Sequence, residues 1–303
     1  MAEPKASAEE LRPDAAEDLD PRLTPLRRQA AGRHGDPARP LAGRVYEVVE
    51  PTAPLRRAPS PDAPLDTEAL KGERVTVFEI SEEGWAWGQL AADRYVGFIP
   101  ASALGDPGPA PTHKVAALRT LVFPGPSAKL PPLEALPLGS RLAIARLAPP
   151  FAVTTTGGYV PASHVVAIDS AEHDFVAVAE RFVGAPYLWG GKTSLGIDCS
   201  GLIQVALTAC GTPCPRDSDM QEKALGRALA PTLDSAEFQR GDLVFWPGHV
   251  AIVREPATLV HANAFHMAVA VEPIVDALTR LRTAGTEVTS VRRLDQTTQP
   301  GHA

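Results

Sequence analysis

One cysteine stands out in this chain because of the residues on either side of it. Cys199 lies in the run Asp198-Cys-Ser-Gly201, Gly190 and Gly191 stand upstream, and a helix-like apolar run covers residues 202–209. A cysteine in the first turn of a helix faces unpaired backbone N–H groups and the positive end of the helix dipole. Both favour thiolate over thiol, so we expect a depressed pKa and a nucleophilic role at Cys199. A small buried thiol is the alternative, but packing alone does not explain the glycine-rich approach.

Two histidines downstream could complete a nucleophilic site. His249 opens an apolar, strand-like run, and His261 lies inside the next such run. Imidazole titrates near neutral pH, so we predict that His249 is the base that takes the thiol proton. If the two runs pair as antiparallel strands, the ring of His261 can orient that of His249, as the third member of a triad does. His266 is a rival for this place, but it follows a predicted turn, whereas His261 lies mid-strand.

The other cysteines do not indicate a metal site. Cys210 and Cys214 form a C-x-x-x-C pair, but a structural zinc site needs a second pair of Cys or His ligands. No such pair stands near them. We expect Cys210 to be buried in a helix and Cys214 to lie in a loop, with no metal and no other cofactor.

Composition limits the classes of partner. The chain has 303 residues, 44% of them apolar, and a formal net charge of −7. The negative charge and the lack of a basic cluster argue against nucleic acid and anionic membrane. No apolar run reaches the ~18 residues of a spanning helix, and residues 1–20 lack the apolar core of a signal peptide. Together with only three cysteines, this predicts a cytoplasmic protein without a disulfide framework. The oligomeric state stays open.

The order of patterns along the chain predicts several regions. Residues 1–43 are polar and are expected to be mostly disordered, and residues 296–303 form a loose tail. Short strands and turns predict a small β-barrel over residues 44–105. A second barrel over residues 112–168 is indicated by an internal repeat, because Gly97-Phe-Ile-Pro-Ala-Ser102 resembles Gly158-Tyr-Val-Pro-Ala-Ser163.

The pattern changes again in residues 170–295. Apolar spacing predicts helices over residues 170–183, 199–210 and 276–282. Strand-like runs cover residues 242–246, 249–253, 258–261, 267–271 and 286–292. Helices followed by antiparallel strands make an α+β domain.

Residues 172–294 resemble the NlpC family of bacterial cell-wall cysteine peptidases. The resemblance rests on a set of motifs in family order: Tyr-Leu-Trp-Gly-Gly at 187–191, Asp-Cys-Ser-Gly at 198–201, Pro-Arg-Asp-Ser at 215–218, Arg-Gly-Asp-Leu-Val-Phe-Trp at 240–246, Gly-His-Val at 248–250 and Val-His-Ala at 260–262. It implies a papain-like core with Cys199, His249 and His261 as triad, preceded by two SH3-like barrels. This layout is similar to the subfamily that cleaves γ-D-glutamyl–diamino acid bonds in free murein peptides with an unblocked N-terminal L-Ala.

The same resemblance implies a set of substrate contacts. Asp217 would pair with the substrate ammonium, and Tyr95 would be the contribution of the first barrel. The remaining expected contacts are Ser200, Ser218, Tyr187, Trp189 and Asp198. A carboxylate facing one ammonium would also penalise an acylated amine. An Asx turn after Pro215 remains an alternative role for Asp217, and a barrel-surface position remains one for Tyr95.

Other functions stay open at this point. The same triad could serve an amidase or acyltransferase, since a thioester can pass to water or to another nucleophile. A murein endopeptidase without selection for a free N-terminus is a further possibility. Barrels alone would indicate a wall-peptide-binding protein with a vestigial catalytic domain, but Cys199, His249 and His261 are all present. In each case the expected partner is a small murein peptide.

Overall fold

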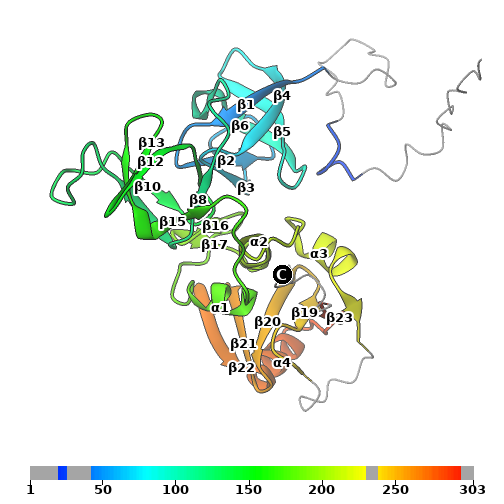
Figure 1. Cartoon of the computed structure of the whole chain (residues 1–303). Coiled ribbons are helices and arrows are strands. Elements are labelled where there is room, and N and C mark those ends of the chain that lie inside the picture. The colour runs from blue at the N-terminus through cyan, green and yellow to red at the C-terminus, as the bar shows by residue number, and fades with distance from the viewer. Residues whose placement is uncertain (1–19, 26–41, 230–237, 295–303) are drawn as a thin grey trace, which may run out of the picture.

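The computed structural model of the protein describes residues 20–25, 42–229 and 238–294. It shows two β-rich units followed by a mixed helix and strand domain (Figure 1). The expected fold class, an α+β peptidase-like domain after two small barrels, is confirmed. Most of the segment 1–43 and the tail 296–303 lie outside the described residues, but residues 20–25 form a turn that contacts the first barrel.

The first barrel is a single antiparallel sheet that closes around an apolar core. Its strand order is β3-β2-β6-β5-β4-β1-β7. Alternate residues point inward, as Ala53 and Leu55 in one strand and Val75 and Val77 in another show by their burial. The strands are β1 (Arg44–Val48), β2 (Thr52–Arg56), β3 (Leu65–Leu70), β4 (Arg74–Ile80), β5 (Trp85–Leu90), β6 (Val96–Pro100) and β7 (Leu104–Gly105).

The second barrel repeats part of this design with shorter strands. In each barrel the repeated motif forms a strand that ends at its proline, Pro100 or Pro161, and a 3₁₀ turn follows at once. The second core is correspondingly small. Its strands are β8 (His113–Val115), β9 (Arg119–Val122), β10 (Glu134–Pro137), β11 (Arg141–Leu142), β12 (Ile144–Ala148), β13 (Phe151–Thr154), β14 (Tyr159–Pro161) and β15 (Val165–Ala167).

The third domain is built on an antiparallel sheet with strand order β18-β23-β19-β20-β21-β22. Its first helix is shorter than residues 170–183, because the chain passes into turns after Glu180 and reaches Gly184 at φ +88°. Its strands are β16 (Lys192–Thr193), β17 (Gly196–Ile197), β18 (Arg227–Ala228), β19 (Leu243–Trp246), β20 (His249–Glu255), β21 (Thr258–Asn263), β22 (Ala268–Pro273) and β23 (Ser290–Arg293). Its helices are α1 (Phe175–Glu180), α2 (Cys199–Ala209), α3 (Ser218–Ala224) and α4 (Ile274–Thr283).

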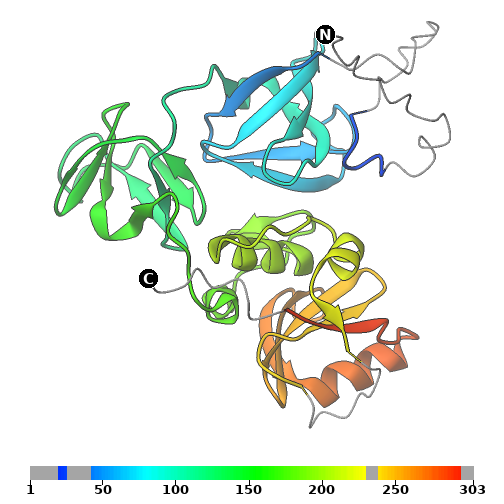
Figure 2. The same cartoon turned by 45° about the vertical axis from the view of Figure 1, so that its right-hand side comes forward.

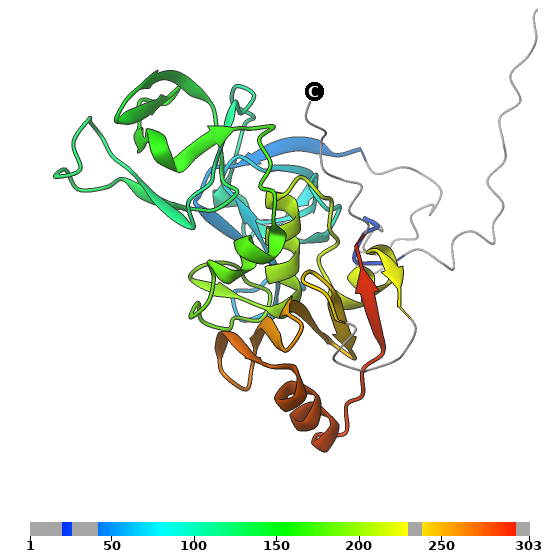
Figure 3. The ribbon, with the colours of Figure 1, turned by 60° about the horizontal axis from the view of Figure 1, so that its bottom comes forward.

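Helices cover both faces of this sheet, so its central strands are buried on both sides. On one face Leu243 and Phe245 of β19 pack in the cluster that holds α1 and α2. On the other face Val244 and Trp246 pack with α4, which lies away from the barrels (Figure 3). Alternate side chains of β19 therefore pack into two different hydrophobic cores, one on each face of the sheet. No helix within the described residues is both long and apolar enough to cross a membrane.

The first barrel lies over the end of the third domain that carries α2 and α3 (Figure 2). Several polar contacts join the two. Glu68 of β3 accepts a hydrogen bond from the backbone N–H of Lys192 at 2.9 Å, and Asp93 accepts one from Gln204 of α2 at 2.8 Å. Gly190 has φ +78°, and a Cβ there would lie 2.5 Å from the carbonyl oxygen of Leu65. Glycine thus allows the chain before α2 to run directly against the barrel.

Candidate active site

Cys199 is the first residue of α2, and the residue before it fixes the start of the helix. The Asp198 side chain caps α2 by accepting the backbone N–H of Gly201 at 2.7 Å through Oδ1. Its Oδ2 accepts the N–H of Gly190 at 2.8 Å, so the upstream glycine loop is tied to the same carboxylate. Capping satisfies helix N–H groups that would otherwise be unpaired. Asp198 therefore sets the position of the thiol.

A buried arginine holds this capping carboxylate in place. Arg216 is 1% exposed and binds Asp198 through two hydrogen bonds of 2.9 and 2.8 Å. It also donates to Ser200 Oγ at 2.8 Å and, through Nε, to Thr67 Oγ1 of the first barrel at 2.9 Å. The same guanidinium thus joins the helix of the nucleophile to the barrel. The polar atoms of Asp198 and Ser200 are engaged inside the protein, and their expected substrate contacts stay a prediction.

The two predicted histidines meet across neighbouring strands. His249 begins β20 and His261 lies in β21, and Nε2 of the first ring is 2.9 Å from Nδ1 of the second. The other nitrogen of His261, Nε2, is 2.7 Å from Oε1 of Glu272 in β22. Arg280 of α4 in turn pairs with Glu272. His266, the rival for the third position, instead hydrogen-bonds Asn263 at 3.0 Å.

This chain of contacts selects one tautomer for each ring. A carboxylate only accepts, so Nε2 of His261 must donate to Glu272 and Nδ1 must accept when the ring is neutral. His249 then donates from Nε2, which leaves the lone pair on its Nδ1. A backbone hydrogen bond from Val250, the residue after His249, reaches Cys199. The lone pair of a base is therefore on Nδ1 of His249, at the start of the strand whose next residue reaches the thiol through its backbone.

Burial determines the resting charge of this pair. It raises the pKa of the Cys199 thiol to about 12, with the negative charge of Asp198 acting in the same direction. It also lowers the pKa of His249 to about 3, assisted by the positive charge of Arg280. The expected depression of the Cys199 pKa is thus wrong, because loss of hydration outweighs the helix terminus. The pair rests as thiol and neutral imidazole.

The remaining cysteines also differ from expectation. Cys210 closes α2 and is only half-buried, rather than buried, because it stands at the end of the helix. Burial raises its pKa to about 11, with Glu172 adding to the effect. Cys214 lies in a loop as expected but is buried, and burial raises its pKa as well. Among the described residues these two thiols do not form a metal-ligand cluster.

A second group of polar residues lies in the cleft where the barrel meets α3. The hydroxyl of Tyr95 donates to Oδ2 of Asp217 at 3.0 Å, so the barrel and the third domain contribute one residue each. Burial raises the pKa of Asp217, while Arg216, Tyr95 and Arg22 act in the opposite direction. Asp217 begins α3 but makes no capping hydrogen bond with its side chain. Its carboxylate faces the cleft rather than closing an Asx turn, and Tyr95 and Arg22 bind it there.

The other predicted contact residues line this same cleft. It contains the predicted residues Tyr95, Tyr187, Trp189, Asp198, Cys199, Ser200, Asp217 and Ser218. Trp189 is 59% exposed, so its ring is open to a ligand. Tyr187 is partly buried, and burial raises its pKa to about 12, which keeps the phenol neutral. The structure therefore brings the nucleophile and the predicted binding residues to one cavity.

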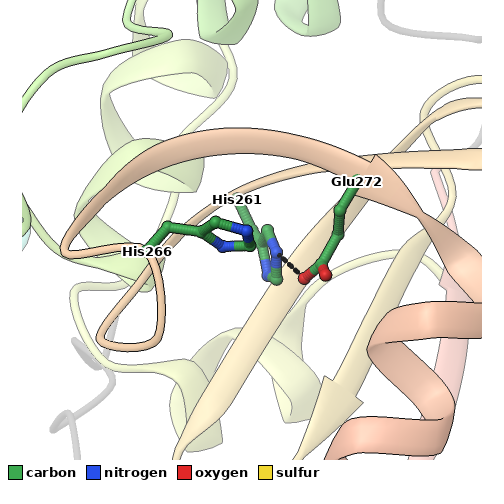
Figure 4. A group of neighbouring side chains, drawn as sticks. All are labelled: His261, His266 and Glu272. Atoms are coloured by element: carbon green, nitrogen blue, oxygen red, sulfur yellow. Dashed lines mark hydrogen bonds and ion pairs between the residues drawn. The ribbon is translucent and has the colours of Figure 1, made fainter.

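One group of side chains has the composition of a metal site. Figure 4 shows the side chains of His261, His266 and Glu272 side by side, and their ligand atoms lie within 4.8 Å of one another. A cation there would compete with Arg280, which already pairs with Glu272, and with the hydrogen bond from His261. We therefore interpret the group as a hydrogen-bonded extension of the histidine pair.

Sequence reasoning assigned no role to Arg216, Glu272 or Arg22. Arg216 lies inside the Pro-Arg-Asp-Ser motif. A single arginine between a proline and a helix-capping position could have identified it from the sequence. Glu272 is a lone acid at the end of an apolar strand, a placement that favours a buried partner. Arg22 stands in a polar segment expected to be mostly disordered, and no local pattern marks it.

Two known families match parts of this chain, one in the first barrel and one in the third domain. Residues 184–286 match the NlpC/P60 family, and residues 55–104 match the family described as bacterial dipeptidyl-peptidase Sh3 domain. A solved structure of an NlpC/P60 family protein from Bacillus cereus superposes with a TM-score of 0.67 over 82% of this chain and 99% of that one. Its sequence identity is 21%, so the likeness concerns the fold.

Similar sequences include several bacterial enzymes. Dipeptidyl-peptidase 6 of Lysinibacillus sphaericus is 37% identical over 102 residues, which is 34% of this chain and 36% of that protein. A gamma-D-glutamyl-L-lysine dipeptidyl-peptidase of Bacillus cereus is 28% identical over 34% of this chain and 32% of its own length. A probable endopeptidase of Mycobacterium tuberculosis is 35% identical over 61% of this chain and 45% of that protein. The chain spans about a third of the length of the first two relatives.

Proposed function

We propose that the protein hydrolyses free murein peptides, because residues 184–286 match the NlpC/P60 family of cysteine peptidases. The bond cleaved joins γ-D-glutamate to the diamino acid, and the substrate carries an unblocked N-terminal L-Ala. The protein would then serve the recycling of wall peptides rather than the cutting of intact wall.

One observation carries the proposal: Tyr95 of the barrel and Asp217 of the peptidase domain meet at one carboxylate oxygen in the cleft of Cys199. A partly buried carboxylate binds a compact ammonium through a charge-assisted hydrogen bond. Barrel residues, among them Trp87 and Tyr95, line the cleft on that side. A peptide whose amine is acylated would lose the charge and meet the barrel. This combination favours an enzyme that starts from a free N-terminus.

The chemistry follows from the resting state of the pair. Cys199 attacks the γ-carbonyl carbon while His249 takes the thiol proton at Nδ1, so the base and nucleophile become charged only during the reaction. His261 and Glu272 stabilise the positive charge that forms on His249. The imidazolium then gives its proton to the amine of the leaving diamino acid, and a thioester remains on Cys199. Water, deprotonated by His249, hydrolyses the thioester and releases L-Ala-γ-D-Glu.

The comparisons support the same class of substrate. The barrel match carries the description of a dipeptidyl-peptidase domain, and two relatives are named dipeptidyl-peptidases. The second is named for a bond between γ-D-glutamate and L-lysine.

Mass spectrometry of digests tests the proposal directly. L-Ala-γ-D-Glu-diaminopimelate should give L-Ala-γ-D-Glu and the free diamino acid, and the lysine tripeptide is tested beside it. The N-acetylated tripeptide should be cleaved at least ~30-fold less efficiently, since it loses the charge-assisted hydrogen bond to Asp217 and its acyl group meets the barrel, which together cost about 2 kcal/mol or more.

Variants separate recognition from general loss of function. Asp217→Asn should slow the free tripeptide and narrow the gap to the acetylated one. Asp106→Asn removes a carboxylate that is exposed and paired with Arg44, and it should leave both rates unchanged. Comparable kcat/KM for free and acetylated tripeptide in the wild-type enzyme would contradict the proposal and indicate a general murein endopeptidase.

A further inference from the structure

The carboxylate proposed to bind the substrate ammonium already faces a cation of the protein itself. Arg22, in the turn of residues 20–25, donates from Nη1 to Oδ2 of Asp217 at 2.8 Å. This is the oxygen that accepts the Tyr95 hydroxyl. Arg22 and its neighbour Asp20 line the same cleft as Cys199.

Every N–H group of this guanidinium has a carboxylate partner. Asp20 receives Nε at 3.0 Å and Nη2 at 2.8 Å, and Asp219 receives Nη1 and Nη2 at 2.8 Å each. The third partner is Asp217. These planar, paired hydrogen bonds hold the guanidinium in one position, whereas the side chain of a typical surface arginine is flexible. The hydrogen bonds to Asp219 and Asp20 raise the pKa of Arg22, so it is charged at every pH of interest.

The backbone of the turn is anchored on the barrel independently of this side chain. The carbonyl of Arg22 accepts the N–H of Val96 at 2.8 Å, and the carbonyl of Leu23 accepts the side-chain amide of Gln89 at 2.8 Å. Leu23 also packs against the barrel core. The short dark blue segment beside the barrel in Figure 2 is this turn. A change at the Arg22 side chain therefore removes the cation without removing the anchors.

We propose that Arg22 is a specificity-determining residue, an internal cation that competes with the substrate ammonium at Asp217. This inference rests on the proposed function, since it concerns the same subsite. An arriving ammonium must either displace the guanidinium from Asp217 or sit beside it at like charge, and both weaken binding. Arg22 thus weakens the binding of peptides to the cleft. Peptides whose only contact there is between their ammonium and Asp217 are disfavoured.

Binding measurements test this without turnover. In a Cys199→Ala background, isothermal titration with the dipeptide L-Ala-γ-D-Glu gives the Kd for Arg22 and for Arg22→Gln. The Kd should fall roughly tenfold in Arg22→Gln, which corresponds to about 1.4 kcal/mol, and Arg22→Lys should lie between. The expected change in Kd is modest because the Arg22 side chain is 34% exposed and surface ion pairs are screened by solvent and salt. In the active enzyme KM should fall to the same extent while kcat stays unchanged.

Two controls define the result. Arg44→Gln removes an exposed arginine of the same barrel outside the cleft and should leave the Kd unchanged. N-acetylated dipeptide should not gain affinity in Arg22→Gln. A Kd that is unchanged or higher in Arg22→Gln, with clear binding to the wild-type site, overturns the competition and leaves the proposed function standing. Absence of binding in all variants, with no cleavage of the tripeptide by the active enzyme, overturns the proposed function itself.

Discussion

Loss of the buried guanidinium of Arg216 should be strongly destabilising. Arg216→Met keeps a similar apolar stem but leaves the Asp198 carboxylate, which is 6% exposed, without its counter-ion. The backbone N–H groups of Gly190 and Gly201 and the hydroxyl of Ser200 would still bind that carboxylate, but none of them carries a charge. Breaking one side of a buried pair costs about 3–5 kcal/mol. For a protein of this size the midpoint of thermal unfolding should fall by roughly 6–20 °C.

Differential scanning calorimetry of single and double variants measures this. Adding Asp198→Asn to Arg216→Met removes the orphaned charge while an amide oxygen can still cap α2. The double variant should therefore recover about half or more of the lost stability, as coupled neighbours do in a double-mutant cycle. A fall of less than ~2 °C in Arg216→Met, or a further large fall on adding Asp198→Asn, would refute the reasoning. A small fall in Arg216→Met would mean that water already solvates the Arg216–Asp198 pair. A further fall in the double variant would mean that the Asp198 carboxylate has another partner.

Three further predictions concern the reaction. Glu272→Gln keeps an acceptor for His261 but removes the charge that steadies the imidazolium, so kcat should fall about 10- to 100-fold with KM unchanged in steady-state assays. The pH profile of kcat/KM for the N-acetylated tripeptide should show no acid limb near 6.5, because the pKa of His249 is lowered to about 3. The enzyme should lose affinity for the free tripeptide as the pH falls through the raised pKa of Asp217. It should also lose affinity above a pH of about 8, where the substrate amine deprotonates. Iodoacetamide labelling of Cys199, followed by peptide mass spectrometry, should accelerate steadily with pH above 8, whereas a plateau between pH 5 and 8 would show a resting thiolate.

Much of the fold could be predicted because its signals are local. Alternating apolar residues mark strands such as β19, and the repeated motif ending at Pro100 and Pro161 forms the same strand and turn in both barrels. The positions of helices followed by strands also indicate the α+β class. The limits of α1 were less accurate, because apolar spacing continues into the turns that end at Gly184.

The candidate catalytic residues could be singled out for a related reason. Cys199 starts a helix and His249 starts a strand, so each carries a mark in its own neighbourhood. Protonation was not predictable in this way. The pKa of Cys199 depends on how much of the chain covers it, and burial prevails over the local helix terminus. The partners Arg216 and Glu272 depend on contacts between distant segments, which spacing does not reveal.

Arg216 also links specificity to catalysis, and this limits what truncation can show. Its guanidinium binds Asp198 beside the nucleophile and Thr67 in the barrel that closes the cleft. Lys192, just before α2, pairs at 3.5 Å with Glu73 of the same barrel. Deleting the barrel would therefore expose buried charges next to Cys199 as well as open the cleft. A truncated enzyme that lost activity would not separate these effects. Point changes at Asp217 and Arg22 do separate them, because the hydrogen bonds of these side chains run to one another and to Tyr95, Asp20 and Asp219 rather than to the Asp198 cap.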